Sequence, residues 1–419
     1  MNILLSVFEC NPLRGSDSYV GWSYATNISH LHTVYALTRS ENRADIEAFC
    51  KKEKIDFPNL HFIYVDQSKL FTKILYKINR YLGFLGSYFV WQKAAYQTAK
   101  KLCKTVRIDV CHHVSIADFR CSGYLWKLDI PFIFGPVGGG QETPLCFKDY
   151  IKGHEKAELF RSKMNKFTTM LPSYRKALKI SKVIFSSNDE TMDYILKRFK
   201  NSPDIKSKVF HLSELCINDE YLHDRIDLHK NQRDIVHIIV SGRLIYRKGI
   251  QVLLDSLPLI NSKTDYIVDI YGEGDQKSFL ESYSQELGLA HKIVFHGKVK
   301  FEDMQENYKT GDIYVLPSLR ESTGTAVLEA MANKIPVITF NQNGAKYIVE
   351  NDAGILVNLS TKDKVLRDLA DALEKLIDNY SLRIKLGQCG FEKVQTKYTW
   401  SNRARSMSEL YKHCGRADK

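Results

Sequence analysis

One stretch of the sequence, residues 313–340, constrains the fold more than any other. An apolar run (Ile313 to Leu316) leads into a small polar turn, then a helix-favouring run (Thr325 to Asn333), then a β-branched run (Val337 to Phe340). This order predicts strand, loop, helix and strand, which is the repeating unit of a parallel sheet. The loop would present free backbone N–H groups at a helix N-terminus, where anions bind.

Two glutamates, Glu321 and Glu329, lie on either side of this predicted anion site. A bare phosphate would be repelled by such carboxylates, but hydroxyl groups attached to the phosphate could donate hydrogen bonds to them. A nucleotide sugar fits, with its diphosphate on the helix end, its sugar on Glu321 and its ribose on Glu329. The alternative is an ordinary turn with two solvated glutamates, because this spacing alone is common by chance.

The motif E-x7-E at Glu321 and Glu329, followed by E-A-M-A and P-V-I, resembles the C-terminal half of the family 4 retaining glycosyltransferases. The resemblance implies an α/β chain with the GT-B fold, in which two Rossmann-like doubly wound domains face each other across a cleft. It assigns the first glutamate to catalysis beside the donor sugar and the second to the ribose. The loop residues that it assigns to donor binding are Ser322, Thr323, Gly324 and Thr325, although the family's commonest loop is E-G-F-G.

A second motif, G-R-L followed by K-G, comes after the apolar run 235–240 and is also similar to family 4. By this resemblance, Arg243 and Lys248 bind the donor diphosphate. A fixed pair of cations would offset the charge that grows on the leaving group. Further along, the family places Lys298 beside the nucleotide base. The alternative for the motif is two solvated basic residues in a loop.

The N-terminal half carries glycine loops after its apolar runs. Ile3 to Phe8 predicts a first strand, and the loop after it contains Gly15 and Ser16. Loops at the carboxyl ends of parallel strands bind ligands, and the resemblance brings these two residues to the donor diphosphate. A tight turn before a helix explains them equally well. A second glycine-rich loop, later in the sequence, contains Gly138, Gly139 and Gly140. We place this loop at the acceptor side.

A predicted strand, residues 108–115, ends in two adjacent histidines, His112 and His113. Family 4 enzymes often carry a histidine near the donor sugar at the end of the equivalent strand, so both are candidates for a catalytic role. Adjacent strand residues point to opposite faces, and His113 is the slightly favoured one. The alternative is a packed, hydrogen-bonded histidine.

A chain of 419 residues is too long for one ordinary domain, so two domains are expected. The boundary falls where the sequence becomes polar and aperiodic, and the last helix resembles the family's closing helix, which returns to the first domain. We predict an acceptor-binding domain over residues 1–216, a linker over 217–233, a nucleotide-sugar-binding domain over 234–395 and the returning helix over 396–419.

The net charge of +12 implies anionic partners. From Gln67 to Ile108 the sequence has no acidic residue, and lysines alternate with aromatic and aliphatic residues. Such a stretch suits an anionic membrane surface. The alternative is a helix pair packed on the sheet with its lysines in solvent. A nucleic acid partner is not expected, because no DNA- or RNA-binding module is visible.

The nine cysteines form no C-x-x-C pair and no metal-ligand spacing. They read as reduced thiols. The apolar start is too short for a signal peptide, and no window is long enough to span a membrane. We expect a cytoplasmic protein, bound peripherally at the inner membrane face if its basic stretch contacts lipid, with no metal and no cofactor.

The expected reaction is retaining transfer of a sugar from a UDP- or GDP-linked donor to a saccharide acceptor, either free or lipid-linked. The motifs G-S-x-x-x-V-G-W and G-P-V-G-G-G resemble a bacterial subgroup that makes surface polysaccharides. The alternatives are a nucleotide-sugar isomerase with the same fold, a non-catalytic nucleotide-sugar binder and a basic nucleic-acid-binding protein.

Overall fold

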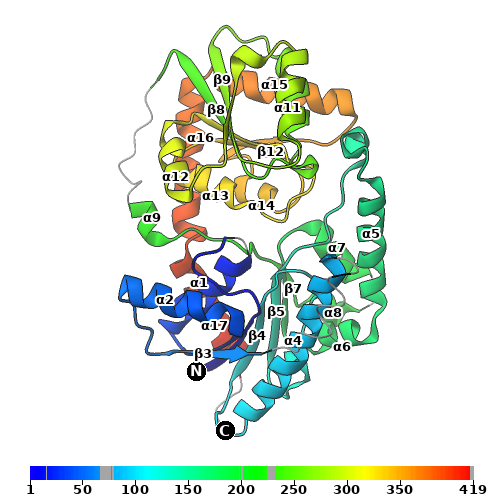
Figure 1. Ribbon diagram of the computed structural model, residues 1–419, viewed down its shortest axis with the longest axis vertical. Coiled ribbons are helices and arrows are strands. Elements are labelled where there is room, and N and C mark those ends of the chain that lie inside the picture. Colours follow the sequence, from blue (N-terminus) through cyan, green and yellow to red (C-terminus); the bar gives the residue numbers. More distant parts are fainter. Residues whose placement is uncertain are drawn as a thin grey trace. The chain divides into compact units, whose positions relative to one another are not determined.

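The chain forms two compact units, each assembled from separate sequence segments. Our computed structural model describes residues 1–15, 17–66, 77, 80–197, 199, 202–223 and 232–415 (Figure 1). Ser16, most of the first half of the predicted membrane stretch and residues 224–231 of the predicted linker therefore lie outside the described residues. The first unit contains Met1–Gly140, Lys163–Glu214 and Trp400–Lys419, and the second contains Gln141–Ser162 and Leu215–Thr399.

The first unit is built on a parallel sheet with strand order β3-β2-β1-β4-β5-β6-β7 among the described residues. This is the doubly wound arrangement, extended by one strand at its edge. Nearly all residues of its central strands are buried, as expected for strands covered on both faces. The strands are β1 (Asn2–Val7), β2 (Thr33–Arg39), β3 (Leu60–Val65), β4 (Val110–Ser115), β5 (Phe132–Val137), β6 (Val183–Ser186) and β7 (Val209–His211).

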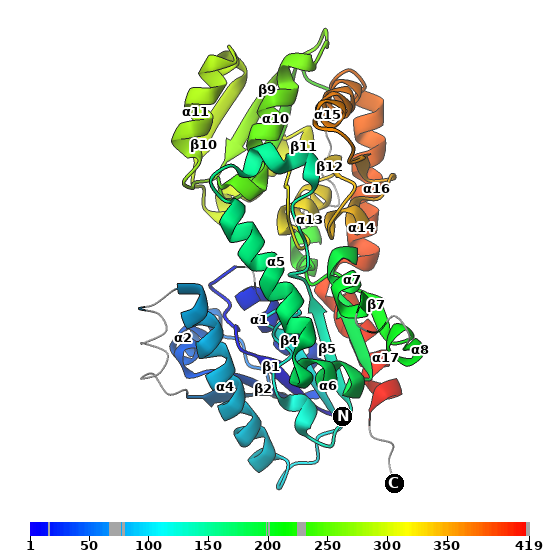
Figure 2. The same cartoon turned by 90° about the vertical axis from the view of Figure 1, so that its right-hand side faces the viewer.

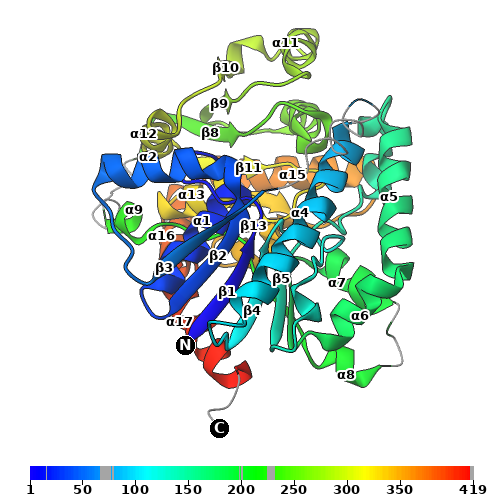
Figure 3. The same ribbon diagram turned by 60° about the horizontal axis from the view of Figure 1, so that its bottom comes forward.

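Helices cover this sheet, and α4 packs on β2 and β3 (Figure 3). Tyr88 and Trp91 of α4 are fully buried and face the core, whereas Phe89 of the same helix is exposed. Its lysines Lys93 and Lys100 are exposed. The helices are α1 (Asp17–Ser29), α2 (Arg43–Glu53), α4 (Arg80–Leu102), α6 (Pro172–Ile180), α7 (Asp189–Lys197), α8 (Pro203–Lys206) and α17 (Trp400–Cys414), with short 3-10 turns η1 (Ser40–Asn42) and η2 (Leu125–Lys127).

The last helix, α17, packs against α1 in the first unit. Arg403 is buried and donates to the hydroxyl of Tyr24 and to the carbonyl of Ser213, at 2.9 and 2.6 Å. The hydroxyl of Ser408 lies 2.9 Å from Nε2 of His32. These polar contacts come from side chains near the end of the sequence and fix the end of the chain on the unit where it began.

The second unit has a parallel sheet in the order β10-β9-β8-β11-β12-β13 among the described residues. Apolar side chains pack on both faces of this sheet, Val236 and Val268 on one and Ile239 and Tyr314 on the other. The strands are β8 (Ile235–Ser241), β9 (Asp265–Tyr271), β10 (Ile293–Gly297), β11 (Ile313–Leu316), β12 (Val337–Phe340) and β13 (Gly354–Val357).

Helices α10 and α15 supply much of one core layer of the second unit, and α13, α14 and α16 supply much of the other. The helices are α9 (Asp219–His223), α10 (Ile250–Ser256), α11 (Lys277–Glu286), α12 (Phe301–Thr310), α13 (Thr325–Ala332), α14 (Ala345–Val349), α15 (Lys362–Ile377) and α16 (Tyr380–Lys397), with η4 (Tyr246–Lys248), η5 (Leu257–Leu259) and η6 (Ala290–Lys292).

The segment 141–162 differs from the predicted domain boundaries, because the structure groups it with the second unit. It contains η3 (Leu145–Ile151) and the first half of α5 (Glu155–Met170), and it lies beside the second sheet (Figure 2). Phe147 and Tyr150 are buried in the core of that unit, and the Tyr150 hydroxyl donates to Asp255 at 2.6 Å. Burial of these aromatic rings explains why the segment packs with the second unit, although the sequence predicts it to be part of the first domain.

The predicted doubly wound α/β class is confirmed in both units. The predicted strands 313–316 and 337–340 match β11 and β12 to the residue. The sequence analysis did not identify β7 or β13. Both are edge strands of three and four residues, and short edge strands give little periodic signal.

Gly249 provides a test of how closely the second unit is packed. Gly249 and Gly288 have nearly the same left-handed backbone, with φ of +66° and +70°. A Cβ on Gly249 would lie 1.9 Å from the Pro317 carbonyl oxygen, whereas a Cβ on Gly288 would meet nothing within 4 Å. We expect Gly288→Ala to cost about 1 kcal/mol through backbone strain, and Gly249→Ala at least about 2 kcal/mol more.

Urea denaturation of both variants and the wild type measures this difference, and Gly288→Ala is the matched control for backbone strain. Equal losses of stability in the two variants would contradict the predicted crowding at Pro317.

Candidate functional site

The candidate site lies where two loops leave neighbouring strands at the centre of the second sheet. Strands β8 and β11 are adjacent, and the direction of the chain's winding changes between them. Ligands of doubly wound folds bind at this point, outside the carboxyl ends of the strands. We call residues 242–249, which follow β8, the cation loop, and residues 317–324, which follow β11, the glutamate loop.

Glu321 in the glutamate loop accepts a hydrogen bond from Lys248 of the cation loop. Nη1 of Arg247 lies 3.5 Å from the same carboxylate oxygen, and the three side chains are only 15–19% exposed. Burial alone would raise the pKa of Glu321, but the charges of Lys248 and Arg247 outweigh it and lower the pKa below its ordinary value. The site thus holds a largely buried glutamate as an anion.

Backbone hydrogen bonds fix the geometry of this ion pair. The N–H of Leu319 donates to the Arg247 carbonyl at 2.9 Å, and the Arg247 guanidinium donates to the Arg320 carbonyl at 3.2 Å. The loop after β12 adds further bonds, because the side-chain amide of Gln342 donates to the carbonyls of Ser318 and Leu319, both at 3.2 Å. The glutamate loop is therefore held from two sides.

The glutamate loop ends at the N-terminus of α13. Gly324 is the residue that caps this helix, and as a glycine it has no side chain that could accept a hydrogen bond from the first helical N–H groups. Thr323 is buried, and its hydroxyl has no hydrogen-bond partner among the described residues. Thr325 is exposed at the first helical position. Polar groups of the predicted donor loop thus gather at a helix end whose partial charge favours an anion.

Glu329, about one turn into α13, has the opposite environment to Glu321. The hydroxyl of Tyr308 donates to it at 3.1 Å, and that hydroxyl also lies 2.9 Å from the hydroxyl of Ser241 at the end of β8. No ion pair to Glu329 is present among the residues that the structure describes. Burial raises the pKa of Glu329 to about 7, although the Tyr308 hydrogen bond opposes the shift.

The other predicted donor residues of the second unit lie at the ends of its strands. Arg243 is exposed in the cation loop. Burial lowers the pKa of Arg247, and the charge of Arg243 lowers it somewhat more. Lys298 is exposed directly after β10. Ser322 accepts a hydrogen bond from the N–H of Gly344 through its carbonyl, at 2.8 Å. Their roles in donor binding stay predictions.

The first unit holds the remaining candidates. Gly15 is exposed, with open space around it, while Ser16 lies outside the described residues. Among the three loop glycines, Gly138 is buried and Gly139 lies against the carboxylate of Asp118. The backbone of Gly140 packs closely against α7 and donates to the Thr191 hydroxyl at 2.9 Å. Gly140 thus serves a close backbone approach, and an acceptor role for the three glycines stays a prediction.

His112 and His113 are both buried in the first unit. Nε2 of His112 donates to the Gly135 carbonyl at 2.6 Å, so Nδ1 is free to accept from the Tyr411 hydroxyl, also at 2.6 Å. Burial lowers the pKa of His112 to about 4 and that of His113 to about 3. Both imidazoles are therefore neutral near pH 7, and their predicted catalytic role is not tested by these contacts.

The sequence analysis missed several residues that shape the site. Arg247 pairs with Glu321, and its position next to Lys248 could have indicated it. Tyr308 contacts Glu329, and Ser241 contacts Tyr308. Neither residue belongs to a sequence motif that could have indicated it. In the first unit, Glu9 pairs with Arg39 at 2.7 Å directly after β1, again without a sequence signal.

Two further observations concern metals and membranes. In the part of the chain that the structure describes, no group of three or more histidine, cysteine, aspartate or glutamate side chains is arranged to hold a metal ion. Among the same residues, no helix combines the length and the apolar character that crossing a membrane needs.

The two glutamates predict opposite responses of stability to pH. The pKa of Glu329 is raised, so its stabilising contribution is full below its unfolded pKa and is lost as pH rises through about 7. The pKa of Glu321 is lowered, so its contribution is present above its unfolded pKa and is lost as pH falls through the folded value. At pH 8 we expect Glu329→Gln to stabilise the protein by about 1–3 kcal/mol and Glu321→Gln to destabilise it.

Urea denaturation at pH 5 and pH 8 measures these differences. The gain in Glu329→Gln should shrink toward pH 5, where the wild-type carboxyl is protonated in the folded state. Effects of the same sign in both variants at pH 8 would contradict the electrostatic description of the site.

Known proteins resemble this chain in sequence and in fold. Residues 224–393 match the family model of glycosyl transferases group 1. An uncharacterized glycosyltransferase of Methanocaldococcus jannaschii is 30% identical over 51% of this chain and 55% of its own length. The capsular polysaccharide biosynthesis glycosyltransferase CapM of Staphylococcus aureus is 29% identical over 52% of this chain and 55% of its own. The chain thus spans about half the length of the curated relatives it matches.

Solved structures match over nearly the whole chain. A sucrose-phosphate synthase of Thermosynechococcus elongatus superposes with a TM-score of 0.64 at 18% identity, covering 98% of both chains. A glycosyltransferase of Rickettsia africae gives the same TM-score and identity, covering 99% of this chain and 98% of its own. At this identity the likeness establishes the fold. Residues 224–393 thus match the glycosyl transferases group 1 model, and the chain has the two-domain α/β architecture of the GT-B fold.

Proposed function

We propose that this protein is a retaining glycosyltransferase, which moves a sugar from a nucleotide-sugar donor to an acceptor hydroxyl. The observation that carries the proposal is the ionised Glu321, held by Lys248 and Arg247 in the loop before the N-terminus of α13, where the capping residue is a glycine. An anion-binding helix end beside a fixed carboxylate suits a ligand that combines phosphate with sugar hydroxyls. The match to group 1 glycosyl transferases supports the same conclusion.

Each residue of the site has a role in the proposed reaction. The helix N–H groups, Arg243 and Lys248 bind the diphosphate of a UDP- or GDP-linked donor and stabilise the charge that develops as it leaves. Glu321 accepts hydrogen bonds from the sugar and supports the positive charge of an oxocarbenium-like transition state. Glu329 binds the ribose hydroxyls. Because cations of the chain neutralise the diphosphate, we propose that the reaction requires no metal.

We propose the class of acceptor from the names of two relatives. CapM is named for capsular polysaccharide biosynthesis. A Mycobacterium tuberculosis relative, 27% identical over 41% of this chain, is named as a GDP-mannose-dependent mannosyltransferase of phosphatidylinositol monomannoside. We therefore propose an acceptor from bacterial surface polysaccharide assembly, a free or lipid-linked saccharide. Isomerisation of a nucleotide sugar is the competing activity of the same fold, and it would consume the donor without an acceptor.

The two glutamates should affect the kinetics differently. We expect Glu321→Gln to lower kcat at least about 100-fold with little change in donor affinity, because its charge acts on the transition state. Glu329→Gln should weaken donor binding with a smaller loss of kcat. Glu286→Gln, an exposed glutamate at the end of α11, is the control. The measurement is steady-state transfer from a panel of UDP- and GDP-sugars, combined with donor titration.

Four outcomes of these measurements would count against the proposal. Normal turnover by Glu321→Gln would remove the role of the glutamate loop. Donor conversion without an acceptor would establish an isomerase. Loss of activity in EDTA, with recovery on adding a divalent metal, would overturn the metal-independent reaction. Inversion at the transferred sugar, read by NMR of the product, would contradict the retaining mechanism.

We also propose that the protein binds the inner face of the membrane through the exposed lysines of α4. Tyr88 and Trp91 of this helix are buried, whereas Phe89 is exposed, and we propose that the attraction is mainly electrostatic. Each lysine near an anionic surface contributes about 1 kcal/mol. The double variant Lys93→Glu/Lys100→Glu should therefore lose most of its cosedimentation with anionic vesicles at low salt, as the wild type should at high salt.

The control for this experiment is Lys375→Glu/Lys385→Glu, which changes the same number of charges on exposed positions of α15 and α16. Equal loss of vesicle binding in both double variants would mean that net charge, not the α4 surface, drives association.

A further inference from the structure

A carboxylate from the segment 141–162 contacts both loops of the candidate site. Oε1 of Glu158 accepts a hydrogen bond from the Tyr246 hydroxyl and another from Nη2 of Arg320, both at 2.8 Å. The hydroxyl of Thr143 donates to its other oxygen at 3.3 Å. The Glu158 and Arg320 side chains are 13% and 16% exposed, so this contact is largely shielded from water.

The two partners of Glu158 are sequence neighbours of the ion pair. Tyr246 directly precedes Arg247 and Lys248, and Arg320 directly precedes Glu321. One carboxylate oxygen therefore joins the cation loop to the glutamate loop. We propose that Glu158 is a positioning residue, which sets the distance between Glu321 and Lys248 and so prepares the site for the donor. The proposal deepens the glycosyltransferase assignment above and rests on it.

Glu158 is charged in this environment. Burial alone would raise its pKa, but the Arg320 guanidinium, the Tyr246 hydroxyl and the charge of Arg161 together lower the pKa below its ordinary value. Hydrogen bonds to a charged carboxylate are roughly twice as strong as those between neutral groups. The contact therefore restrains both loops more than a neutral side chain of the same shape would.

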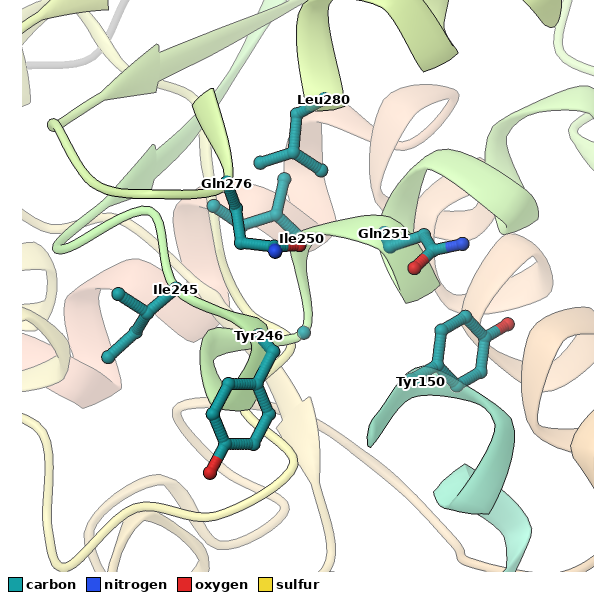
Figure 4. Close-up of a pocket in the computed structure, with 8 residues that line it drawn as sticks. Tyr150, Ile245, Tyr246, Ile250, Gln251, Gln276 and Leu280 are labelled. Carbon is teal, nitrogen blue, oxygen red and sulfur yellow. The ribbon is translucent and has the colours of Figure 1, made fainter. Parts of the chain in front are cut away.

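The ring of Tyr246 is restrained as well. It stacks on His154 of the same segment, with ring centroids 3.9 Å apart and an interplanar angle of 11°. Figure 4 shows the ring beside a small pocket also lined by Tyr150 and Gln276, with its hydroxyl pointing away from both. Segment 141–162 thus holds Tyr246 through its ring face and through its hydroxyl.

The segment has contacts with the second unit besides those of Glu158. Phe147 and Tyr150 are buried in the core of the second unit, and Tyr150 donates to Asp255. If Glu158 served only to attach the segment, removing its charge would act like removing the Tyr150 hydroxyl. A positioning role predicts instead an effect at the two loops that the Tyr150 variant does not share.

The test compares Glu158→Gln and Tyr246→Phe with Tyr150→Phe as the matched control, all in the full chain. Hydrogen exchange without substrate follows the amides of residues 243–249 and 318–324. We expect exchange at least about tenfold faster in Glu158→Gln, because a charge-assisted contact is lost, and a smaller increase in Tyr246→Phe. In transfer assays kcat of Glu158→Gln should fall about tenfold, with KM for the donor within about twofold of the wild type.

A charge exchange provides a second readout. Glu158→Arg and Arg320→Glu should each lower kcat, and the double variant should recover part of the loss, since the ion pair is restored in reverse. Unchanged exchange in Glu158→Gln, unchanged kcat, or equal effects in Tyr150→Phe would overturn the positioning role. If the wild type transfers no sugar, the glycosyltransferase assignment fails, whereas the exchange experiment still decides whether Glu158 restrains the loops.

Discussion

The candidate site depends on the cost of burying the Glu321 carboxylate. A charge removed from water needs partners that restore the lost interactions, and Lys248 and Arg247 provide them. An arriving diphosphate would compete for the same lysine. Glu321 would then need new donors, and sugar hydroxyls are donors of the right kind. Before the donor binds, Lys248 and Glu321 are partners of each other. In the proposed reaction, the phosphate of the donor takes over Lys248, and the sugar of the same molecule takes over Glu321.

The contrast between Glu321 and Glu329 shows how environment separates two identical side chains eight positions apart. Glu321 lies among cations in a loop, and its pKa is lowered. Glu329 lies on the helix against Tyr308, and burial raises its pKa to about 7. Two carboxyls with different charge states can serve different parts of one ligand. The spacing in the sequence gives no hint of this difference, because it depends on side chains from other strands.

Much of the fold could be predicted from the sequence, because buried parallel strands leave apolar runs that end at recognisable turns. The glutamate loop could also be found, since its residues are contiguous. Glu158 could not, because it meets Arg320 across 162 positions of sequence. The aromatic residues of α4 suggested a membrane surface, but Tyr88 and Trp91 are core residues. Composition does not reveal which side of a helix meets the sheet.

The placement of segment 141–162 has a consequence for exchanging parts between related enzymes. Neither unit is continuous in the sequence, since the first regains residues 400–419 and the second includes 141–162. A chimera joined at residue 214 would separate Phe147 and Tyr150 from the core in which they are buried. A part that can be exchanged without loss of packing must therefore contain both residues 215–399 and residues 141–162. Residues 215–399 transplanted without residues 141–162 would expose the apolar surface on which Phe147 and Tyr150 pack.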